Sequence, residues 1–298
     1  MKELCIMIKY ARDILTPIEL DINESVDFVL RSGKTVKIKI LRTGASVIKT
    51  TLKELKVEEI RARTDYEFFC EAEVGETTIL MRREVSAQAS FYEPWTVNGV
   101  TIWLDAVDDI FDFLFETHGP CRPKKKVRLA IQDASLGICP EKLHPWCPLP
   151  DGGLRIEMCY RGEDCWLGAY HGVSAHGGLD LNHQPGTPLW APLDIDDQYY
   201  VNSLAMGHNN NRWEGIHRWP DGSEWIFYAA HMTSLTVPEH QPLKKGTQFA
   251  NGAGVYSGDM HHSHFVFKVM EDGDTFLLDP WILFRQMYLD MDFQKSAI

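Results

Sequence analysis

The chain has 298 residues, of which 44% are hydrophobic and 24% are charged, and its formal net charge is −12. This composition is typical of a folded globular protein, and the acidic charge leaves no electrostatic footprint for nucleic acid, so we expect no nucleic-acid partner. No apolar run approaches the length of a membrane span, so we expect no membrane span. Residues 1–10 resemble neither a signal peptide nor an anchor, so the protein either stays inside the cell or begins after a removed leader.

The first third of the chain is predicted to form β-strands, because apolar and polar residues alternate there between Gly and Asn turns. The candidate strands are residues 36–40, 68–74, 77–81 and 97–104. Asn98-Gly99 inside the last candidate is typical of a tight hairpin and would split it into two strands. Residues 106–116 are acidic and apolar and predict a short helix, with Asp108 and Asp109 suited to its first turn.

We expect a change of domain next, where residues 118–126 combine Gly and Pro with the basic run Lys124-Lys125-Lys126. This composition indicates a loop or interdomain connection in which the lysines form a solvated linker. A strand-like run follows at 127–131. We therefore predict a β-rich accessory domain over residues 1–125 and a second domain over residues 126–298, with the boundary anywhere from about 118 to 140.

Four of the seven cysteines lie just before the histidine-rich part of the chain, namely Cys139, Cys147, Cys159 and Cys165. Their spacings contain no Cys-x-x-Cys pair, which argues against a structural zinc knuckle. A Cys159–Cys165 disulfide would suit an exported protein, whereas buried thiols would suit a cytosolic one. Both alternatives stay open at the level of the sequence.

The first segment with chemical potential is Ser174-Ala-His176-Gly-Gly-Leu-Asp180. His176 and Asp180 are four residues apart, a spacing that places two side chains on one face of either a helix or a strand. Gly177-Gly178 favours a turn leading into a strand. An imidazole and a carboxylate that converge in this way suit Zn²⁺.

The second segment, residues 260–269, alternates at period two. His262 and His264 share one face with Val266 and Lys268, whereas Phe265, Phe267 and Val269 share the other. We predict a strand with an apolar back and a histidine-bearing front. Two imidazoles side by side on a rigid strand suit one metal ligand and one neighbouring acid–base group.

The third segment, residues 225–232, is an apolar strand-like run that ends at His231. A single histidine at a strand end is more often a structural residue than a functional one. Its weight comes from its occurrence with the other two segments.

In combination, these segments resemble the lysostaphin/LytM-type zinc metallopeptidases, a family of peptidoglycan endopeptidases. The family pattern has a His-x₃-Asp element, Gly-Thr-Pro, Ala-Pro, a Tyr/His element, Lys-Lys-Gly and a closing His-x-His-Phe. The corresponding words in this chain, in order, are His176–Asp180, Gly186-Thr-Pro, Ala191-Pro, Tyr228-Ala-Ala-His231, Lys244-Lys-Gly246 and His262-Ser-His264-Phe265. The match spans roughly residues 153–283.

The resemblance implies an antiparallel β domain with one Zn²⁺ per chain at the floor of a groove. His176, Asp180 and His264 would be the metal ligands, and His231 and His262 would be the unligated catalytic pair. One of the pair would accept a proton from a zinc-activated water, and the other would stabilise the oxyanion or protonate the leaving amine. The substrate would be a peptide in peptidoglycan cross-bridges or stem peptides, and the protein would be exported to the periplasm, the cell wall or the medium.

The chain also departs from the family pattern around these residues. Two residues separate Tyr228 from His231 where one is usual, Ser263 replaces a Leu, and residues 196–218 are longer than the usual connection. These departures leave every implied ligand in place and bear on the substrate. Two alternatives follow: a catalytically silent or occluded peptidoglycan-binding module of the same fold, and a zinc amide hydrolase that acts on a peptide outside the wall.

Overall fold

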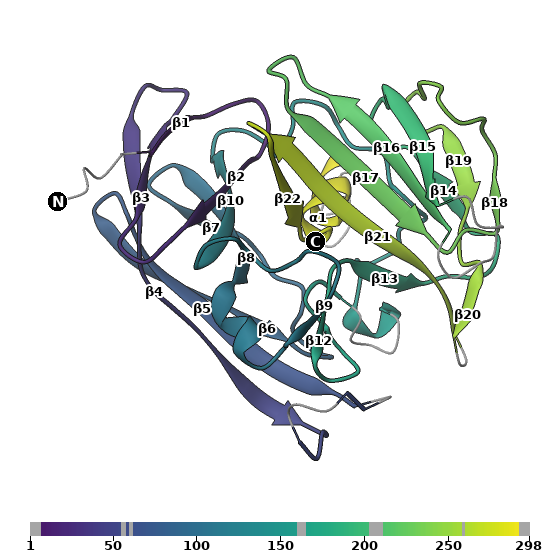
Figure 1. The fold of residues 1–298 in the computed structure, drawn as a ribbon. Helices are drawn as coiled ribbons and strands as arrows, with labels where there is room; N and C mark the ends of the chain where they lie inside the picture. Colours follow the sequence, from purple (N-terminus) through teal and green to yellow (C-terminus); the bar gives the residue numbers. More distant parts are fainter. Residues whose placement is uncertain are drawn as a thin grey trace. The chain divides into compact units, whose positions relative to one another are not determined.

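The computed structural model describes residues 7–54, 58–59, 62–159, 165–202, 211–257 and 260–291. Within these ranges β-strands dominate and form several largely antiparallel sheets, which confirms the predicted mainly-β fold class (Figure 1). No helix among these residues has both the length and the apolar character needed to cross a membrane.

The chain divides into two compact units, and each is described by itself. The first comprises residues 1–140 together with Ala169–Ala175, and the second comprises residues 141–168 together with residues 176–298. The first unit extends past residue 125 because β10 (Val127–Asp133) is hydrogen-bonded to β2 (Thr16–Leu20) on one side and to β8 (Val100–Val107) on the other. The accessory role of the N-terminal residues stays a prediction.

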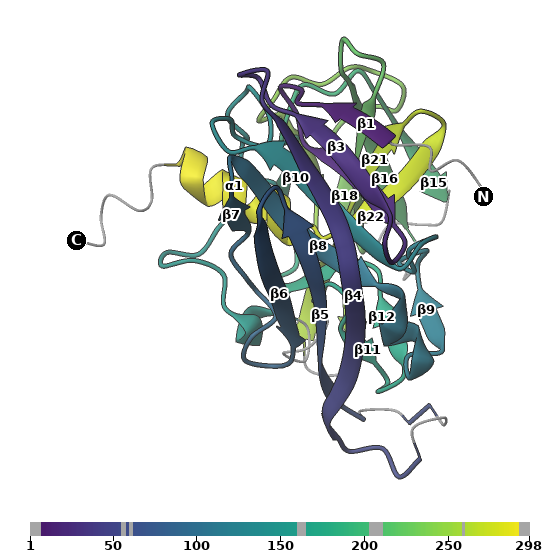
Figure 2. The same cartoon turned by 90° about the vertical axis from the view of Figure 1, so that its left-hand side faces the viewer.

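The largest sheet of the first unit has the strand order β1-β3-β4-β5-β6, and its long strand β4 runs through the middle (Figure 2). Its strands are β1 (Met7–Tyr10), β3 (Ser25–Val29), β4 (Thr35–Thr50), β5 (Thr64–Val74) and β6 (Thr77–Val85). The β1–β3 pair is parallel and the other pairs are antiparallel. Buried and less buried residues alternate strictly along β5, as expected for a strand with one face in the core.

Two smaller sheets complete the first unit. One has the order β2-β10-β8-β7, where β7 is Trp95–Val97. The other has the order β11-β12-β9, formed by β11 (Ala169–Tyr170), β12 (Ser174–His176) and β9 (Glu116–His118). The segment Ala169–Ala175 is held within this unit by Val173, which is buried with Leu52 and Ala62.

Most local predictions for this unit are confirmed. The four candidate strands lie within β4, β5, β6 and the β7–β8 pair, and β7 and β8 are joined by a turn in which Asn98 and Gly99 both have positive φ, at 52° and 89°. Positive φ at both turn residues is the geometry that favours Asn-Gly in hairpins.

The expected short helix within 106–116 is confirmed in part: it is a 3₁₀ helix, η1 (Asp108–Asp112), with Asp108 and Asp109 in its first turn, and it begins only where the pairing of β8 with β10 ends, after Val107. The basic run is not a free solvated linker, because Lys125 donates to Glu24 at 2.6 Å and Lys126 donates to Asp108 at 2.9 Å. Neighbouring carboxylates therefore neutralise part of its charge.

The second unit is built on an antiparallel sheet with the order β13-β21-β17-β16-β15, and β20 and β22 also pair with β21 (Figure 1). Its strands are β13 (Leu179–Asn182), β15 (Asp197–Asn202), β16 (Arg212–Arg218), β17 (Glu224–Ala230), β20 (Val255–Ser257), β21 (Met260–Glu271) and β22 (Asp274–Leu278). A small sheet, β14-β19-β18, comprises Pro188–Trp190, Gln248–Asn251 and Ser234–Leu235. The helical elements are η2 (Ile156–Met158) and α1 (Trp281–Asp290).

The two faces of β21 differ in the way that the sequence predicts. Phe265 and Phe267 are fully buried on the back of the sheet, where the Phe265 ring lies 4.9 Å from the ring of Trp146 and 5.4 Å from that of Phe284 in α1. Phe267 packs edge-on against Trp225 at 5.1 Å. Since the back is filled by aromatic rings, alternation along the strand leaves His262 and His264 on the front.

Phe267→Ala is expected to lower the free energy of unfolding by about 3–5 kcal/mol, because it removes a fully buried ring and leaves a cavity between Trp225 and Phe227. Met270→Ala on the same strand is the matched control, because Met270 is exposed and its truncation should cost no more than about 0.5 kcal/mol. Denaturant unfolding followed by tryptophan fluorescence measures both. Equal losses for the two variants would contradict the assignment of the back face as core.

Candidate metal centre

The first two predicted ligands face each other across one strand pair. β13 and β21 are antiparallel, and Asp180 lies directly opposite His264, so their side chains project from the same face of the sheet. Nδ1 of His264 is 2.6 Å from Oδ1 of Asp180. Asn182 lies opposite His262 in the same register, which places His262 one step along this face.

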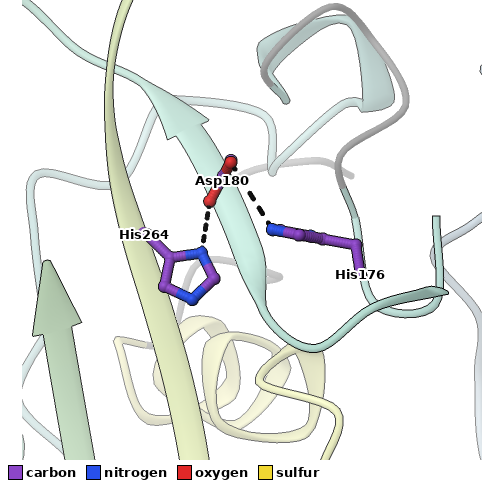
Figure 3. Close-up of side chains that lie close together, drawn as sticks. All are labelled: His176, Asp180 and His264. Carbon is purple, nitrogen blue, oxygen red and sulfur yellow. Dashed lines mark hydrogen bonds and ion pairs between the residues drawn. The ribbon is translucent and has the colours of Figure 1, made fainter. Parts of the chain in front are cut away.

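The third predicted ligand, His176, is the last residue of β12 and approaches Asp180 from the other side (Figure 3). Its Nε2 lies 3.6 Å from Oδ2 of Asp180, and its Nδ1 lies 3.2 Å from the carbonyl oxygen of Cys165. When Nδ1 donates its hydrogen to that carbonyl, Nε2 keeps its lone pair. A backbone carbonyl on the remote nitrogen is the arrangement that orients imidazole ligands in metal sites.

Gly178, in the turn between His176 and Asp180, has no room for a side chain. A Cβ atom there would overlap Cε1 of His264 and lie 2.8 Å from both its Nε2 and the carbonyl oxygen of Phe265. The turn between His176 and β13 therefore passes directly against the ring of His264. The Gly-Gly pair that indicated a turn in the sequence thus also provides the space that this imidazole occupies.

The three residues form a group that fits a divalent metal ion. One ligand atom from each of His176, Asp180 and His264 can be chosen so that all lie within 4.8 Å of one another, and the side chains are 1%, 7% and 10% exposed. Two imidazole nitrogens and one carboxylate oxygen are ligands that suit zinc, and three protein ligands leave a coordination position open.

The electrostatics of the group favour an ionised carboxylate. Burial by itself raises the pKa of Asp180, but the neighbouring His176 and His264 and the hydrogen bond with His264 outweigh it and hold that pKa well below its usual range. A buried carboxylate therefore requires positive charge beside it. A divalent cation held by the same atoms would supply that charge while leaving both imidazoles neutral.

The two residues assigned to the catalytic pair lie beside this group. The rings of His231 and His262 are 4.7 Å apart, and the ring of His231 is 6.0 Å from that of His264. Nε2 of His262 lies 3.6 Å from Oδ2 of Asp180. All five residues selected from the sequence are thus brought together, and their individual roles stay predictions.

His231 is held in an unusual backbone conformation, with φ of 63°, just beyond the end of β17. The buried side chain of Asn211 fixes the next residue, since its amide donates to the carbonyl of Met232 at 2.6 Å and its oxygen accepts from the Met232 amide at 2.8 Å. The amide of Gly254 donates to the carbonyl of His231. Asn211, which lies just before β16, the strand that pairs with β17, was not predicted from the sequence. Its burial and its contact with the turn after His231 become visible only in the folded structure.

Tyr228 also borders the group, with its ring 5.9 Å from that of His264. Burial raises its pKa to about 12, so the phenol stays protonated at neutral pH and can donate a hydrogen bond. Nearby on the same face, Glu214 accepts hydrogen bonds from Lys268 at 2.8 Å and from Tyr199 at 3.1 Å.

Comparisons with known proteins name the same kind of enzyme as the resemblance in the sequence. No protein-family model and no curated protein matches the chain. Among solved structures, it is similar to the antimicrobial peptidase lysostaphin from Staphylococcus simulans, with 23% identity over 38% of this chain and 45% of that chain and a TM-score of 0.29. It is similar to the catalytic domain of the same peptidase, with 22% identity, 48% and 90% coverage and a TM-score of 0.29.

A third similar structure is a zinc-containing peptidase from Vibrio cholerae, with 12% identity over 88% of this chain and 83% of that chain and a TM-score of 0.27. The chain spans about half the length of the two longer lysostaphin structures that it matches. Because all these TM-scores are below 0.5, the functional assignment rests on the geometry of the site.

Gly178→Ala is expected to weaken zinc binding by about ten- to a hundredfold, because the new methyl group displaces the ring of His264. Gly222→Ala in the turn before β17 is the control: a Cβ there meets nothing within 4 Å, but φ of 88° makes it a strained site. It should cost stability without loss of zinc. Zinc affinity by competition with a chromogenic chelator, together with thermal unfolding, separates the two effects. Unchanged zinc affinity of Gly178→Ala would contradict this account.

Proposed function

We propose that this protein is a zinc-dependent endopeptidase that cleaves peptide bonds in the cross-bridges or stem peptides of peptidoglycan. The observation that carries the proposal is the buried His176–Asp180–His264 group with two further imidazoles beside it on the same face. The location that goes with such a substrate is outside the cytoplasm. The substrate would bind in a groove over the site, as the resemblance in the sequence implies.

The chemistry divides between the metal ligands and their neighbours. Zinc held by the three ligands would polarise the scissile carbonyl and lower the pKa of water. His231 and His262 are close enough to each other to share the proton transfers, one as the base and the other as the donor to the leaving amine or the oxyanion. Tyr228, whose phenol stays protonated, offers a further hydrogen-bond donor at the edge of the site.

Variants of His262 and His264 test the proposed roles of base and metal ligand separately, although the two residues lie close together on one strand. His264→Ala should remove both zinc and activity, whereas His262→Ala should keep about one zinc per chain and lower the cleavage rate by about 10²- to 10⁴-fold. His240→Ala is the matched control, since this side chain is 70% exposed, and it should change neither quantity.

The assay digests purified sacculi and identifies the released fragments by mass spectrometry. A chelator should abolish the release and added zinc should restore it. Loss of zinc from His262→Ala would make this residue a fourth ligand, which its 3.6 Å distance from Asp180 allows, and would contradict its proposed role as a base. A zinc-loaded protein that binds sacculi and releases no fragment would be a binding module.

Asn211→Ala is expected to lower the cleavage rate by about a hundredfold with zinc content unchanged, because loss of both hydrogen bonds to Met232 frees the turn that holds His231. Asn98→Ala is the control: it also removes a side-chain amide bonded to a backbone carbonyl, here Val74, in the hairpin of the first unit. The measurements are the digestion rate and the zinc content of each variant. Full activity of Asn211→Ala would contradict a positioning role for this residue.

A further inference from the structure

The register of the sheet places an arginine in the same row as the proposed metal ligands. Asp180 lies opposite His264, His264 lies opposite Ala230, and Ala230 lies opposite Arg212. Directly opposed residues of antiparallel strands project from the same face, so Arg212 lies on the face that bears the metal group. Strands are spaced by about 4.8 Å, which puts the backbone of Arg212 about 10 Å from that of His264.

Ala230, which lies between Arg212 and His264 in this row, has a small side chain. Ala230 has a single methyl group, whereas its neighbour on this face of β17 is the large side chain of Tyr228. Within the row, therefore, no long side chain separates the guanidinium of Arg212 from the imidazole of His264. A substrate bound at the metal group would extend along this row.

The positive charge of Arg212 is not neutralised by the described part of the chain. Its guanidinium makes no ion pair or hydrogen bond with a residue in the described ranges, and the nearby carboxylate of Glu214 is already engaged by Lys268 and Tyr199. In a chain of net charge −12, a half-buried arginine that has no partner among the described residues and lies beside the proposed catalytic group is suited to bind a charged ligand.

We propose that Arg212 is a specificity-determining residue that binds a carboxylate of the peptide substrate close to the scissile bond. The proposal rests on the endopeptidase function proposed above and adds the substrate chemistry. The spacing between Arg212 and His264 corresponds to no more than about three residues of extended peptide. The carboxylate belongs either to an acidic side chain or to the free C-terminus of a short peptide, and a guanidinium binds both in the same bidentate manner.

The test combines a change in the enzyme with a change in the substrate. The zinc-loaded full chain and its Arg212→Ala and Arg212→Gln variants digest intact sacculi and sacculi whose carboxyl groups have been amidated with carbodiimide and ammonia. For the wild type, amidation should slow digestion by about ten- to a hundredfold, the range of a charge-assisted hydrogen bond. Both variants should digest intact sacculi at that slower rate and should be nearly insensitive to amidation.

Arg218→Ala is the matched control. Arg218 lies on the same strand, six residues and about 20 Å from Arg212, and its charge is paired with Glu224 at 3.0 Å. This variant should keep the wild-type response to amidation. Zinc content and thermal unfolding, measured for every variant, identify any variant that has failed to fold, and Arg212→Gln preserves most of the side-chain volume if Arg212→Ala does fail.

Synthetic peptides then separate the two sources of the carboxylate. A set of acetylated hexapeptides carries Glu or Gln at each position in turn, and each member is made with a free carboxylate and with a carboxamide terminus. If Arg212→Gln slows cleavage only of peptides that carry Glu at one position, the bound carboxylate is an acidic side chain. If it slows cleavage only of peptides with a free C-terminal carboxylate, the bound group is the C-terminus.

Two results would overturn the proposal while leaving the endopeptidase function intact. One is wild-type digestion that is equally fast for intact and amidated sacculi, and the other is an equal loss for Arg212→Ala on both substrates. Absence of digestion by the zinc-loaded wild type on either substrate would instead refute the endopeptidase function, and the role of Arg212 would fall with it.

Discussion

The pairing of Asp180 with His264 across β13 and β21 is the contact on which the rest of the site depends. A carboxylate on a side chain that is only 7% exposed carries a large desolvation cost, which close positive charge must offset. His264 meets it from the neighbouring strand at 2.6 Å, and His176 faces its other oxygen. A slip of one residue in this register would turn His264 towards the aromatic core and leave the carboxylate without it.

The aromatic back of the sheet keeps that register in place. The rings of Trp146, Phe265 and Phe284 form a cluster that a shifted strand could not fill, because its histidines would then face the same space. The proposed metal ligands of this strand pair are therefore positioned by packing on the opposite side of the sheet. Consecutive residues of β21 therefore alternate between a back face that stabilises the fold and a front face that carries the proposed chemistry.

The proposed proton-transfer residues are held in two different ways. His262 is positioned by the strand itself, whereas His231 lies beyond the end of β17 with a left-handed backbone that the amide of Asn211 and the loop at Gly254 support. Support of this kind comes from residues distant in sequence. The row that continues through Ala230 to Arg212 likewise arises from strand order alone, and it connects the His176–Asp180–His264 group to the arginine that we propose binds the substrate.

The sequence by itself determined the local elements of the fold, including those that carry the site. Alternation at period two predicted the two faces of β21, the Gly-Gly turn predicted the approach of His176 to β13, and Asn98-Gly99 predicted its hairpin, because each depends on backbone geometry over a few residues. The helix expected over 106–116 is shorter than predicted, because β8 stays paired with β10 as far as Val107.

Only the tertiary structure decided how distant residues meet. It showed that Asp180 opposes His264, that Asn211 supports the turn after His231, and that Arg212 lies in the row of the ligands. It also assigned Val127–Asp133 to the first unit through its pairing with β2 and β8. Strand order and register are set by the packing of a whole sheet, and the spacing of residues along one strand carries no record of which strand lies beside it.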